Sequence, residues 1–193
     1  MRTITVVENL SLDGVMQSPS GPDEDASNGF TAGGWAGPLR ADPAASQAVF
    51  SGSGRTSAML FGRRTYDRLV GFWLSTGDPN PFTRVLRDTP KYVATHRAEA
   101  LPHPNSIRLE GDALDAIRAA KAEGEGEIVV LGSGDLVRQL LAAGLVDELV
   151  LAVVPVVVGS GRKLFGGTPL AVDVMRHDAF PSGITVTRWA VRR

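Results

Sequence analysis

The chain has 193 residues and a mass of 20.4 kDa, a size typical of one α/β domain with a sizeable core. Hydrophobic residues make up 43% and charged residues 21%, which excludes a disordered chain and a protein embedded in a membrane. The net charge of −1 provides no electrostatic basis for binding nucleic acid, and zero cysteines exclude disulfides, zinc–thiolate sites and thiol nucleophiles.

The apolar stretches are too short for a targeting or membrane-spanning segment. The start, MRTITVVENLSLDG, has only a short apolar run before Glu8, so we expect no signal peptide. The longest apolar run, Leu149–Val158, is interrupted by Pro155 and is too short to cross a bilayer. We therefore expect a cytoplasmic protein with no membrane partner.

One strand and one long loop are expected in the first quarter of the chain. Thr3–Val7 is typical of a strand, and ENLSLDG after it of a turn. Between Gln17 and Pro43 the composition shifts to Gly, Pro, Ser and acidic residues, and so long a structureless segment is usually functional or disordered. Phe30 and Trp35 favour a loop that docks onto something.

Short helices and strands alternate through the middle of the chain. The expected strands are Ala58–Phe61, Tyr92–Ala94 and Ser106–Leu109. The expected helices are Pro43–Gly52, Thr65–Val70 and Asp112–Ala122, and Gly71–Pro90 is expected to be an irregular connection.

The clearest strand–turn–helix unit lies at Glu127–Glu148. Ile128–Leu131 is a continuous, β-branched apolar run, typical of a strand covered on both faces. Gly132-Ser133-Gly134 breaks the pattern, and the helix that follows carries Asp135 in its first turn and ends at Gly144. A glycine turn that opens a helix presents backbone N–H groups to anionic phosphates, although an empty βα turn explains this stretch equally well.

The last part of the chain is expected to be rich in strands. Glu148–Val158 is predicted as a long strand, and Leu170–Phe180 with Ile184–Val191 as an antiparallel hairpin. The alternation as a whole predicts an α/β fold in one domain, residues 1–193, with a mostly parallel sheet and helices on both faces.

Three predicted strand ends carry polar or glycine-rich groups. They are Gly62–Thr65, Thr95–Arg97 and Gly132–Asp135. Ligands of open α/β sheets lie outside the carboxyl ends of the strands, so three such ends in one chain favour a nucleotide site. Each arginine there, taken alone, is equally typical of solvated surface charge.

Other chemistries fit the sequence less well. Gly132-x-Gly134 lacks the third glycine of a Rossmann turn, and no G-x-S-x-G hydrolase elbow occurs. The three histidines are not at metal-ligand spacings, and the acidic run Asp23–Asp25 is more typical of a solvated loop, so we expect no metal.

Taken together and in order, several motifs resemble the dihydrofolate reductase-like family, and more closely the reductase domain of bacterial riboflavin biosynthesis and its stand-alone relatives. The motifs are SLDGVM (Ser11–Met16), GGW…P (Gly33–Pro38), FGRRTYDRL (Phe61–Leu69), YVATHR (Tyr92–Arg97), VVLGSGDLVRQLL (Val129–Leu141) and GLVDELVLAVVPVVVGSGRKLF (Gly144–Phe165). The resemblance covers nearly the whole chain and implies a mostly parallel sheet of about eight strands with a C-terminal antiparallel hairpin.

The resemblance also implies an NADPH site. Its G-R-x-T motif would hold the pyrophosphate and the 2′-phosphate, and the end of the 92–94 strand would lie beside the adenosine phosphate. The glycine turn and the helix start would line the nicotinamide and the pyrophosphate, and a mobile loop would cover the nicotinamide. In this chain the corresponding residues are Gly62, Arg63, Arg64, Thr65, Thr95, His96, Arg97, Gly132, Ser133, Gly134, Asp135, Leu136, Val15 and Met16.

For the acceptor, the resemblance implies a site formed by the Asn9–Met16 turn, which includes Asp13, by the Phe30–Trp35 loop and by the cofactor. Relatives place a catalytic carboxylate on the first helix, after the tryptophan, and Asp42 is the nearest candidate for a proton donor. Asp42 also suits a helix N-cap.

The function expected on this basis is an NADPH-dependent oxidoreductase, similar to dihydrofolate reductase or to 5-amino-6-(5-phosphoribosylamino)uracil reductase, that acts on a small heterocyclic or carbonyl substrate. One alternative is a nucleotide-binding module or sensor without turnover. Another alternative is a structural dimer module based on the apolar strand Leu149–Val158. We expect the protein to be a homodimer.

Overall fold

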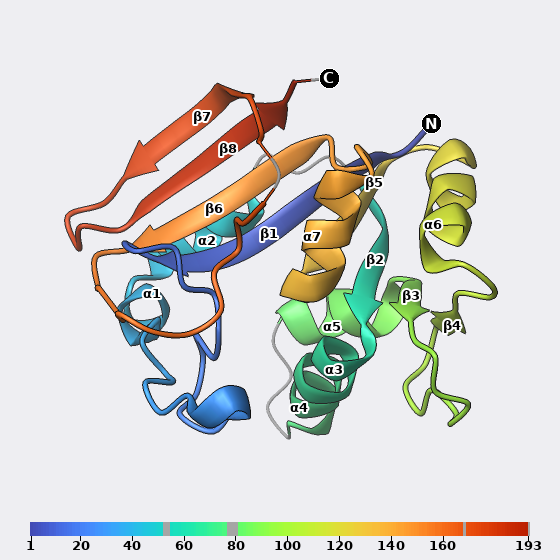
Figure 1. The fold of residues 1–193 in the computed structure, drawn as a ribbon, viewed down its shortest axis with the longest axis horizontal. Coiled ribbons are helices and arrows are strands. Elements are labelled where there is room, and N and C mark those ends of the chain that lie inside the picture. The colour runs from blue at the N-terminus through green and yellow to red at the C-terminus, as the bar shows by residue number, and fades with distance from the viewer. Residues whose placement is uncertain (52–54, 77–80, 168, 193) are drawn as a thin grey trace. The chain divides into compact units, whose positions relative to one another are not determined.

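The computed structural model describes residues 1–51, 55–76, 81–167 and 169–192. Eight strands form one sheet in the order β4-β3-β2-β5-β1-β6-β8-β7 (Figure 1). Their bounds are β1 Thr3–Ser11, β2 Thr56–Gly62, β3 Lys91–Ala94, β4 Ser106–Arg108, β5 Glu127–Leu131, β6 Glu148–Val154, β7 Val172–Ala179 and β8 Thr185–Val191. The sheet and its C-terminal antiparallel pair confirm the predicted fold class.

The helices are short. They are η1 Ser27–Gly29, α1 Gly37–Ala41, α2 Pro43–Phe50, α3 Arg63–Thr65, η2 Tyr66–Val70, α4 Gly71–Ser75, α5 Pro81–Asp88, α6 Ala113–Ala122 and α7 Gly134–Ala142. Within the described residues, no helix is both long and apolar enough to span a bilayer.

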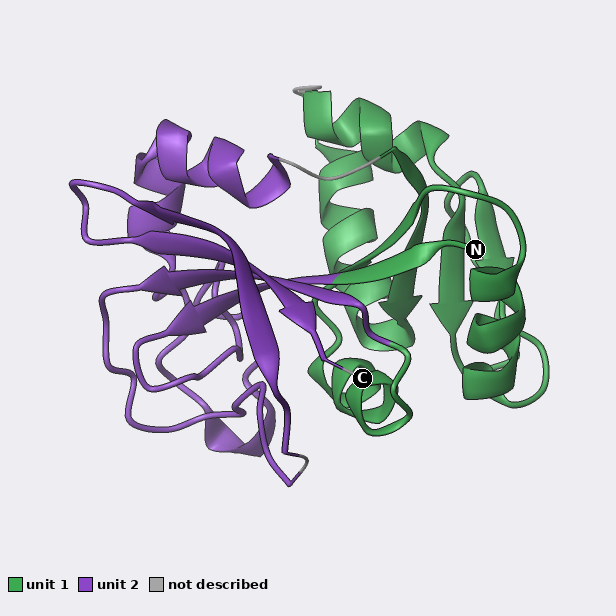
Figure 2. Ribbon diagram, turned by 90° about the horizontal axis from the view of Figure 1, so that it is seen from above, with its two compact units in different colours: residues 1–5, 54–145 green, residues 6–53, 146–193 purple. Residues whose placement is uncertain are grey.

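The chain divides into two compact units (Figure 2). Unit 1 comprises Met1–Thr5 and Gly54–Leu145, and unit 2 comprises Val6–Ser53 and Val146–Arg193. β1 contributes its first residues to unit 1 and the others to unit 2.

Unit 1 is built on a parallel arrangement of strands. β2 pairs with β3 on one side and with β5 on the other, and β3 pairs with β4. All five residues of β5 are buried, as its apolar run predicts, and α7 packs on β2 through a buried stripe of Leu136, Val137 and Leu140. Because these strands are parallel, the carboxyl ends of β2, β3 and β5 lie at one edge.

Unit 2 is built on antiparallel pairs. β8 pairs with β6 and with β7, and α2 packs on β6 and β8 through Ala45, Ala48 and Val49. β6 is an inner strand with most side chains buried, so its apolar sequence is explained by the core. The interpretation of Leu149–Val158 as a dimer strand is therefore not needed, and the strand ends at Val154 because proline follows.

Three sequence-based assignments are wrong. The segment expected to be structureless between Gln17 and Pro43 contains η1 and α1. A turn was expected directly after Val7, but the strand continues to Ser11. The charge of Glu8 suggested an exposed residue, whereas the structure buries its side chain. The connection over 71–90, expected to be irregular, contains α4 and α5 in its described part. Residues 77–80 lie outside the described residues, and so does Gly52, the last residue of the predicted 43–52 helix.

Candidate functional site

The glycine turn after β5 is held against the end of β2 in unit 1. The hydroxyl of Ser133 accepts a hydrogen bond from the backbone N–H of Gly62 at 2.8 Å. Gly132 and Ser133 both have positive φ, of 64° and 70°, and a Cβ on Gly132 would lie 3.1 Å from Cγ2 of Thr65. The turn therefore needs glycine at position 132, both for its backbone angle and for close packing on Thr65.

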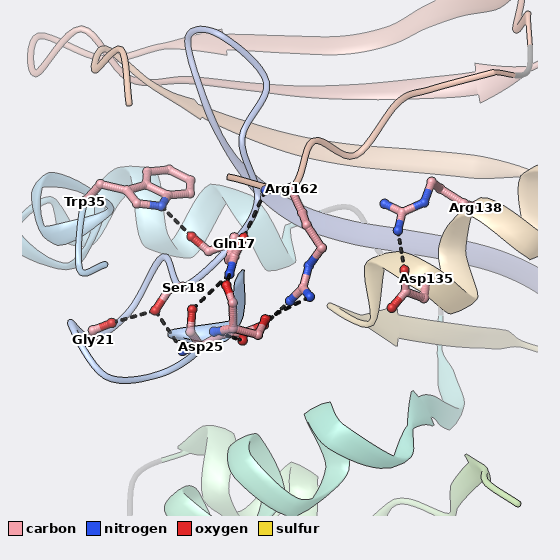
Figure 3. A network of polar contacts seen from close by, with 9 residues as sticks. Gln17, Ser18, Gly21, Asp25, Trp35, Asp135, Arg138 and Arg162 are labelled. Carbon is pink, nitrogen blue, oxygen red and sulfur yellow. Dashed lines mark hydrogen bonds and ion pairs between the residues drawn. The ribbon is translucent and has the colours of Figure 1, made fainter. Parts of the chain in front are cut away.

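Backbone N–H groups are available where α7 begins. Ser133, the N-cap residue, makes no side-chain bond to the first turn of the described helix, since its hydroxyl is engaged by Gly62. Asp135 lies in that turn and forms an ion pair with Arg138 (Figure 3). Free N–H groups at the start of a nine-residue helix can bind an anion, and Leu136 beside them is buried.

Arg63 is largely engaged by groups of its own unit. Its Nε lies 2.8 and 2.9 Å from the two carboxylate oxygens of Asp67, and its Nη1 donates to the carbonyl of Glu99 at 3.4 Å. The Arg63 side chain is 15% exposed. It therefore links the helix after β2 to the segment after β3, and Arg64 beside it is exposed.

The strand end at 95–97 is more open. Thr95 is half-buried and its hydroxyl accepts a hydrogen bond from the backbone N–H of Arg97 at 3.1 Å, while His96 is exposed. The Arg97 side chain is 65% exposed, with Nη1 3.8 Å from Asp67. Arg108 on β4 donates to the carbonyls of Arg97 and Glu99, which holds this segment in place.

In unit 2, Asp13 fixes the turn that follows β1. Its carboxylate accepts hydrogen bonds from the backbone N–H groups of Val158 and Gly159, each at 3.0 Å, and from the Ser11 hydroxyl at 2.7 Å. These bonds lower the pKa of Asp13 to about 2, and the bond from Val158 has the largest effect. The carboxylate predicted to bind substrate is thus used to tie two chain segments together.

The loop after this turn is held by a polar network centred on Arg162 (Figure 3). The Arg162 guanidinium forms an ion pair with Asp25 and donates to the Ser27 hydroxyl at 3.1 Å, while its backbone N–H donates to Oε1 of Gln17 at 3.0 Å. Gln17 in turn donates to the carbonyls of Asp25 and Ser27 and accepts from the Trp35 indole at 2.8 Å. The long loop is therefore held in this structure by contacts with Arg162 and by contacts within the loop.

Phe30 and Val15 pack against the same segment. Gly161 has φ of 109°, and a Cβ there would lie 2.7 Å from the Phe30 ring and 3.0 Å from Val15. Both side chains are buried, so they act as core of the loop. Met16 is half-buried, and its N–H donates to the Arg162 carbonyl at 2.9 Å. Of the two residues expected to cover the nicotinamide, Met16 has the more accessible side chain.

Asp42 is the N-cap of α2. Its carboxylate accepts a hydrogen bond from the Ala45 N–H at 3.0 Å and one from the Ser182 hydroxyl at 2.6 Å. These bonds hold the pKa of Asp42 below its ordinary value, and the bond from Ala45 has the largest effect. A general acid must carry its proton at the working pH, so this geometry favours the helix-cap interpretation over the proton donor.

Sequence reasoning missed three residues of unit 2. Gln17 and Arg162 form the network, and their signal was weak, because polar residues in loops are common. Glu8 is buried on β1. The sequence pattern that could have indicated Glu8 is a single acidic residue within the apolar strand TITVVENLS. The acidic residue suggested instead that the strand ends before it.

Comparison with known proteins gives a family match over nearly the whole chain. The model of the RibD C-terminal domain family matches residues 2–186. An uncharacterized protein of Bacillus subtilis, YyaP, is 26% identical over 110 residues, and the match spans 55% of this chain and 58% of that protein. The similarity to this curated relative thus covers little more than half of either chain.

Solved structures share the fold. A putative riboflavin biosynthesis protein from Shewanella sp. PV-4 has a TM-score of 0.65 with 21% identity and full coverage of both chains. A pyrimidine reductase-like protein from Corynebacterium diphtheriae has a TM-score of 0.63 with 14% identity, over 100% of this chain and 92% of that one. Dihydrofolate reductase from Enterococcus faecalis, solved with NADP(H), has a TM-score of 0.60 with 12% identity, over 99% and 97%.

Proposed function

The chain belongs to the RibD C-terminal domain family, and on this premise we propose that it is an NADPH-dependent reductase of a small pteridine- or pyrimidine-like heterocycle or a small carbonyl compound. Its fold is the reductase-type fold related to pyrimidine and folate reduction. The observation that carries the proposal is the junction of β2 and β5, where Ser133 binds the N–H of Gly62.

The junction fits the pyrophosphate of a dinucleotide. Gly62 and Gly132 let two adjacent strand ends pack closely on Ser133 and Thr65, and the N–H groups at the start of α7 have no side-chain cap among the described residues. Free N–H groups at a helix start suit a doubly charged pyrophosphate, which needs several donors. Thr65, which packs on Gly132, adds a hydroxyl nearby.

The cations after β2 and β3 suit a phosphate monoester. Arg97 is the more exposed of the pair that shares Asp67, so we propose it as the main contact of the 2′-phosphate. Arg63 supports it by holding Asp67 and the Glu99 carbonyl, and Arg64 and His96 add exposed cationic or hydrogen-bonding groups. When bound, NADPH supplies the hydride from C4 of its nicotinamide.

Unit 2 provides the residues proposed for the acceptor. Asn9 is half-buried near the end of β1, and Trp35 is positioned by its indole bond to the Gln17 carbonyl. Asp13, Phe30 and Val15 hold the surrounding turn and loop in shape rather than offering free polar groups. A preformed loop of this kind orients a planar ring and excludes water from it.

A titration of the purified protein with NADPH and, in parallel, with NADH tests the proposal. We expect saturable quenching of tryptophan fluorescence that strongly favours NADPH, followed by NADPH oxidation with at least one member of a panel of ketones, quinones and pteridines. Binding of neither nucleotide would overturn the proposal and leave only the fold.

A nucleotide-binding module or sensor without turnover is a second candidate, because Asp42 is in the wrong protonation state for a proton donor. The same panel separates the two functions. Tight NADPH binding with no oxidation above the rate without protein would favour the sensor.

We also propose a homodimer. β7 is an edge strand of the sheet, and it exposes Val174 and Met175 by 59% and 54%. Edge strands with exposed apolar residues commonly pair with another chain. Sedimentation should give twice the monomer mass at micromolar concentration, and a monomer there would contradict the proposal.

A further inference from the structure

The segment that follows β3 in unit 1 is held by side chains and not by a backbone ladder. Within the described residues, no backbone–backbone hydrogen bond involves residues 95–102, and His96, Arg97 and Glu99 are exposed. The bond from the Arg97 N–H to the Thr95 hydroxyl lies inside the segment itself. Because an exposed segment without ladder bonds opens easily, its shape depends on the side chains that reach it from other elements.

Two arginines from neighbouring elements bind this segment. Arg108 lies on β4, the edge strand beside β3 (Figure 1). Its Nη1 donates to the Arg97 carbonyl, and its Nη2 donates to the Glu99 carbonyl at 2.6 Å. Arg63 Nη1 donates to the same Glu99 carbonyl at 3.4 Å. Charged donors make strong hydrogen bonds, and the planar fork of a guanidinium can fix two acceptors at once, so Arg108 anchors the Arg97 backbone.

The Arg97 side chain leaves this anchored backbone with most of its surface open. It is 65% exposed, and its Nη1 lies 3.8 Å from Asp67, whose carboxylate is bound by the Nε of Arg63 at 2.8 and 2.9 Å. Glu99 lies 4.0 Å from Arg63. The contacts thus join three guanidinium groups to two carboxylates, which leaves a positive balance that suits the dianion of a phosphate monoester.

We propose that Arg108 is a positioning residue for coenzyme choice. It fixes the backbone from which Arg97 reaches the 2′-phosphate, and thereby determines the preference for NADPH over NADH. This role rests on the proposed function, in which Arg97 is the main contact of that phosphate. It deepens the function by assigning the preference to a residue that donates to main-chain carbonyls and acts through its neighbour.

An anchor of this kind lowers the cost of binding. Ordering a loop and an arginine side chain at the moment of binding opposes affinity, whereas a segment that is already held meets this cost during folding. NADH has a hydroxyl group where NADPH has the 2′-phosphate, so NADH gains nothing from a fixed Arg97. Loss of the anchor should therefore weaken NADPH and leave NADH as it is.

Arg108→Met tests the role, because it removes the fork and keeps an unbranched apolar stem. The control is Arg118→Met, at an exposed arginine of unit 1 that pairs with Asp115. Dissociation constants for NADPH and NADH are measured by tryptophan fluorescence, together with the Tm of each variant. We expect NADPH affinity to fall about 5-fold in Arg108→Met, with NADH affinity unchanged and the control like the wild type.

A contact that is merely structural gives a different result. It would lower the Tm of Arg108→Met and leave the preference for NADPH at the wild-type value, which overturns the positioning role. Parallel losses of NADPH and NADH affinity overturn it as well. Arg108→Ala is measured beside Arg108→Met with the same expected result, so that the test does not depend on the folding of one variant.

A double-mutant cycle with Arg97→Ala separates positioning from the charge of Arg108. Because Arg108 acts through Arg97, we expect Arg108→Met to have no further effect on NADPH affinity in the Arg97→Ala background. A loss of NADPH affinity that persists in that background would mean that the Arg108 charge acts on the coenzyme directly, and it overturns the positioning role.

The proposed function and the role of Arg108 fail differently. Wild-type protein that binds neither NADPH nor NADH overturns both. Wild-type protein that binds the two coenzymes equally well overturns the role of Arg108 and leaves a reductase without coenzyme preference. A preference for NADPH that survives in Arg108→Met overturns the role of Arg108 alone.

Discussion

The Ser133 hydroxyl accepts a hydrogen bond from the Gly62 backbone N–H at 2.8 Å, and this contact joins the ends of two strands that lie 71 residues apart in the chain. It has two effects. It fixes the glycine turn before α7, and it occupies the side chain that would otherwise cap that helix. The N–H groups at the start of α7 thereby stay available for a ligand.

The turn itself can be tested with a matched pair of glycines. Gly132 and Gly144 have nearly the same φ, 64° and 63°, but a Cβ would meet Thr65 only at position 132. We expect Gly132→Ala to weaken NADPH binding about 10-fold or more, and Gly144→Ala to leave it unchanged although it carries the same backbone strain. Equal affinities of the two variants would show that the turn does not approach the cofactor.

Coenzyme preference should depend on Arg97. Its side chain is 65% exposed and lies next to Asp67, whereas Arg63 is mostly enclosed. We expect Arg97→Ala to weaken NADPH roughly 10-fold and to leave NADH affinity unchanged, because only NADPH carries the 2′-phosphate. The control is Arg118→Ala, which removes an exposed arginine paired with Asp115. Parallel losses for both coenzymes would assign Arg97 to another part of the cofactor.

The Arg162 network should determine how ordered the 17–35 loop is. Arg162→Met keeps an unbranched apolar stem but loses the ion pair with Asp25 and the bond to Ser27. We expect faster proteolytic cleavage within the loop and a red shift of the tryptophan emission, to which Trp35 contributes, because charge-assisted hydrogen bonds of this kind contribute on the order of 2 kcal/mol each. Arg176→Met, which removes an exposed ion pair with Asp178, is the control. Cleavage at the same rate in both variants would contradict this role.

The pH dependence of stability should report the protonation of Glu8. Its pKa is about 8 in the folded chain against 4.5 as an ordinary value, so the folded state binds more protons between these pH values. The stabilisation is fully present below about pH 4.5 and is lost as the pH rises through 8. The Tm of the wild type should therefore fall relative to that of Glu8→Gln between pH 5 and 8. Parallel Tm curves over this range would mean that Glu8 is ionised in the folded protein.

Local patterns were enough for most of the architecture. The apolar run of β5, the glycine break after it and the helical spacing of Leu136, Val137 and Leu140 each depend on neighbouring residues, and the structure has strand, turn and helix there. The order of the motifs along the chain indicated the family. The boundaries failed where polarity misled, as at Glu8, where a charged residue lies inside a strand.

The roles of individual polar side chains depended on contacts that no local pattern contains. Asp13 binds N–H groups 145 and 146 residues away, Asp42 binds Ser182, and Arg63 is engaged by Glu99. Each of these contacts gives a predicted ligand group a structural partner from a distant part of the chain. The sequence by itself determined the elements, their order and the family, because backbone preference and apolar periodicity are local properties. Only the tertiary structure decided which carboxyl groups are ionised and which cations are open, since desolvation and hydrogen bonding arise between residues that are distant in the chain.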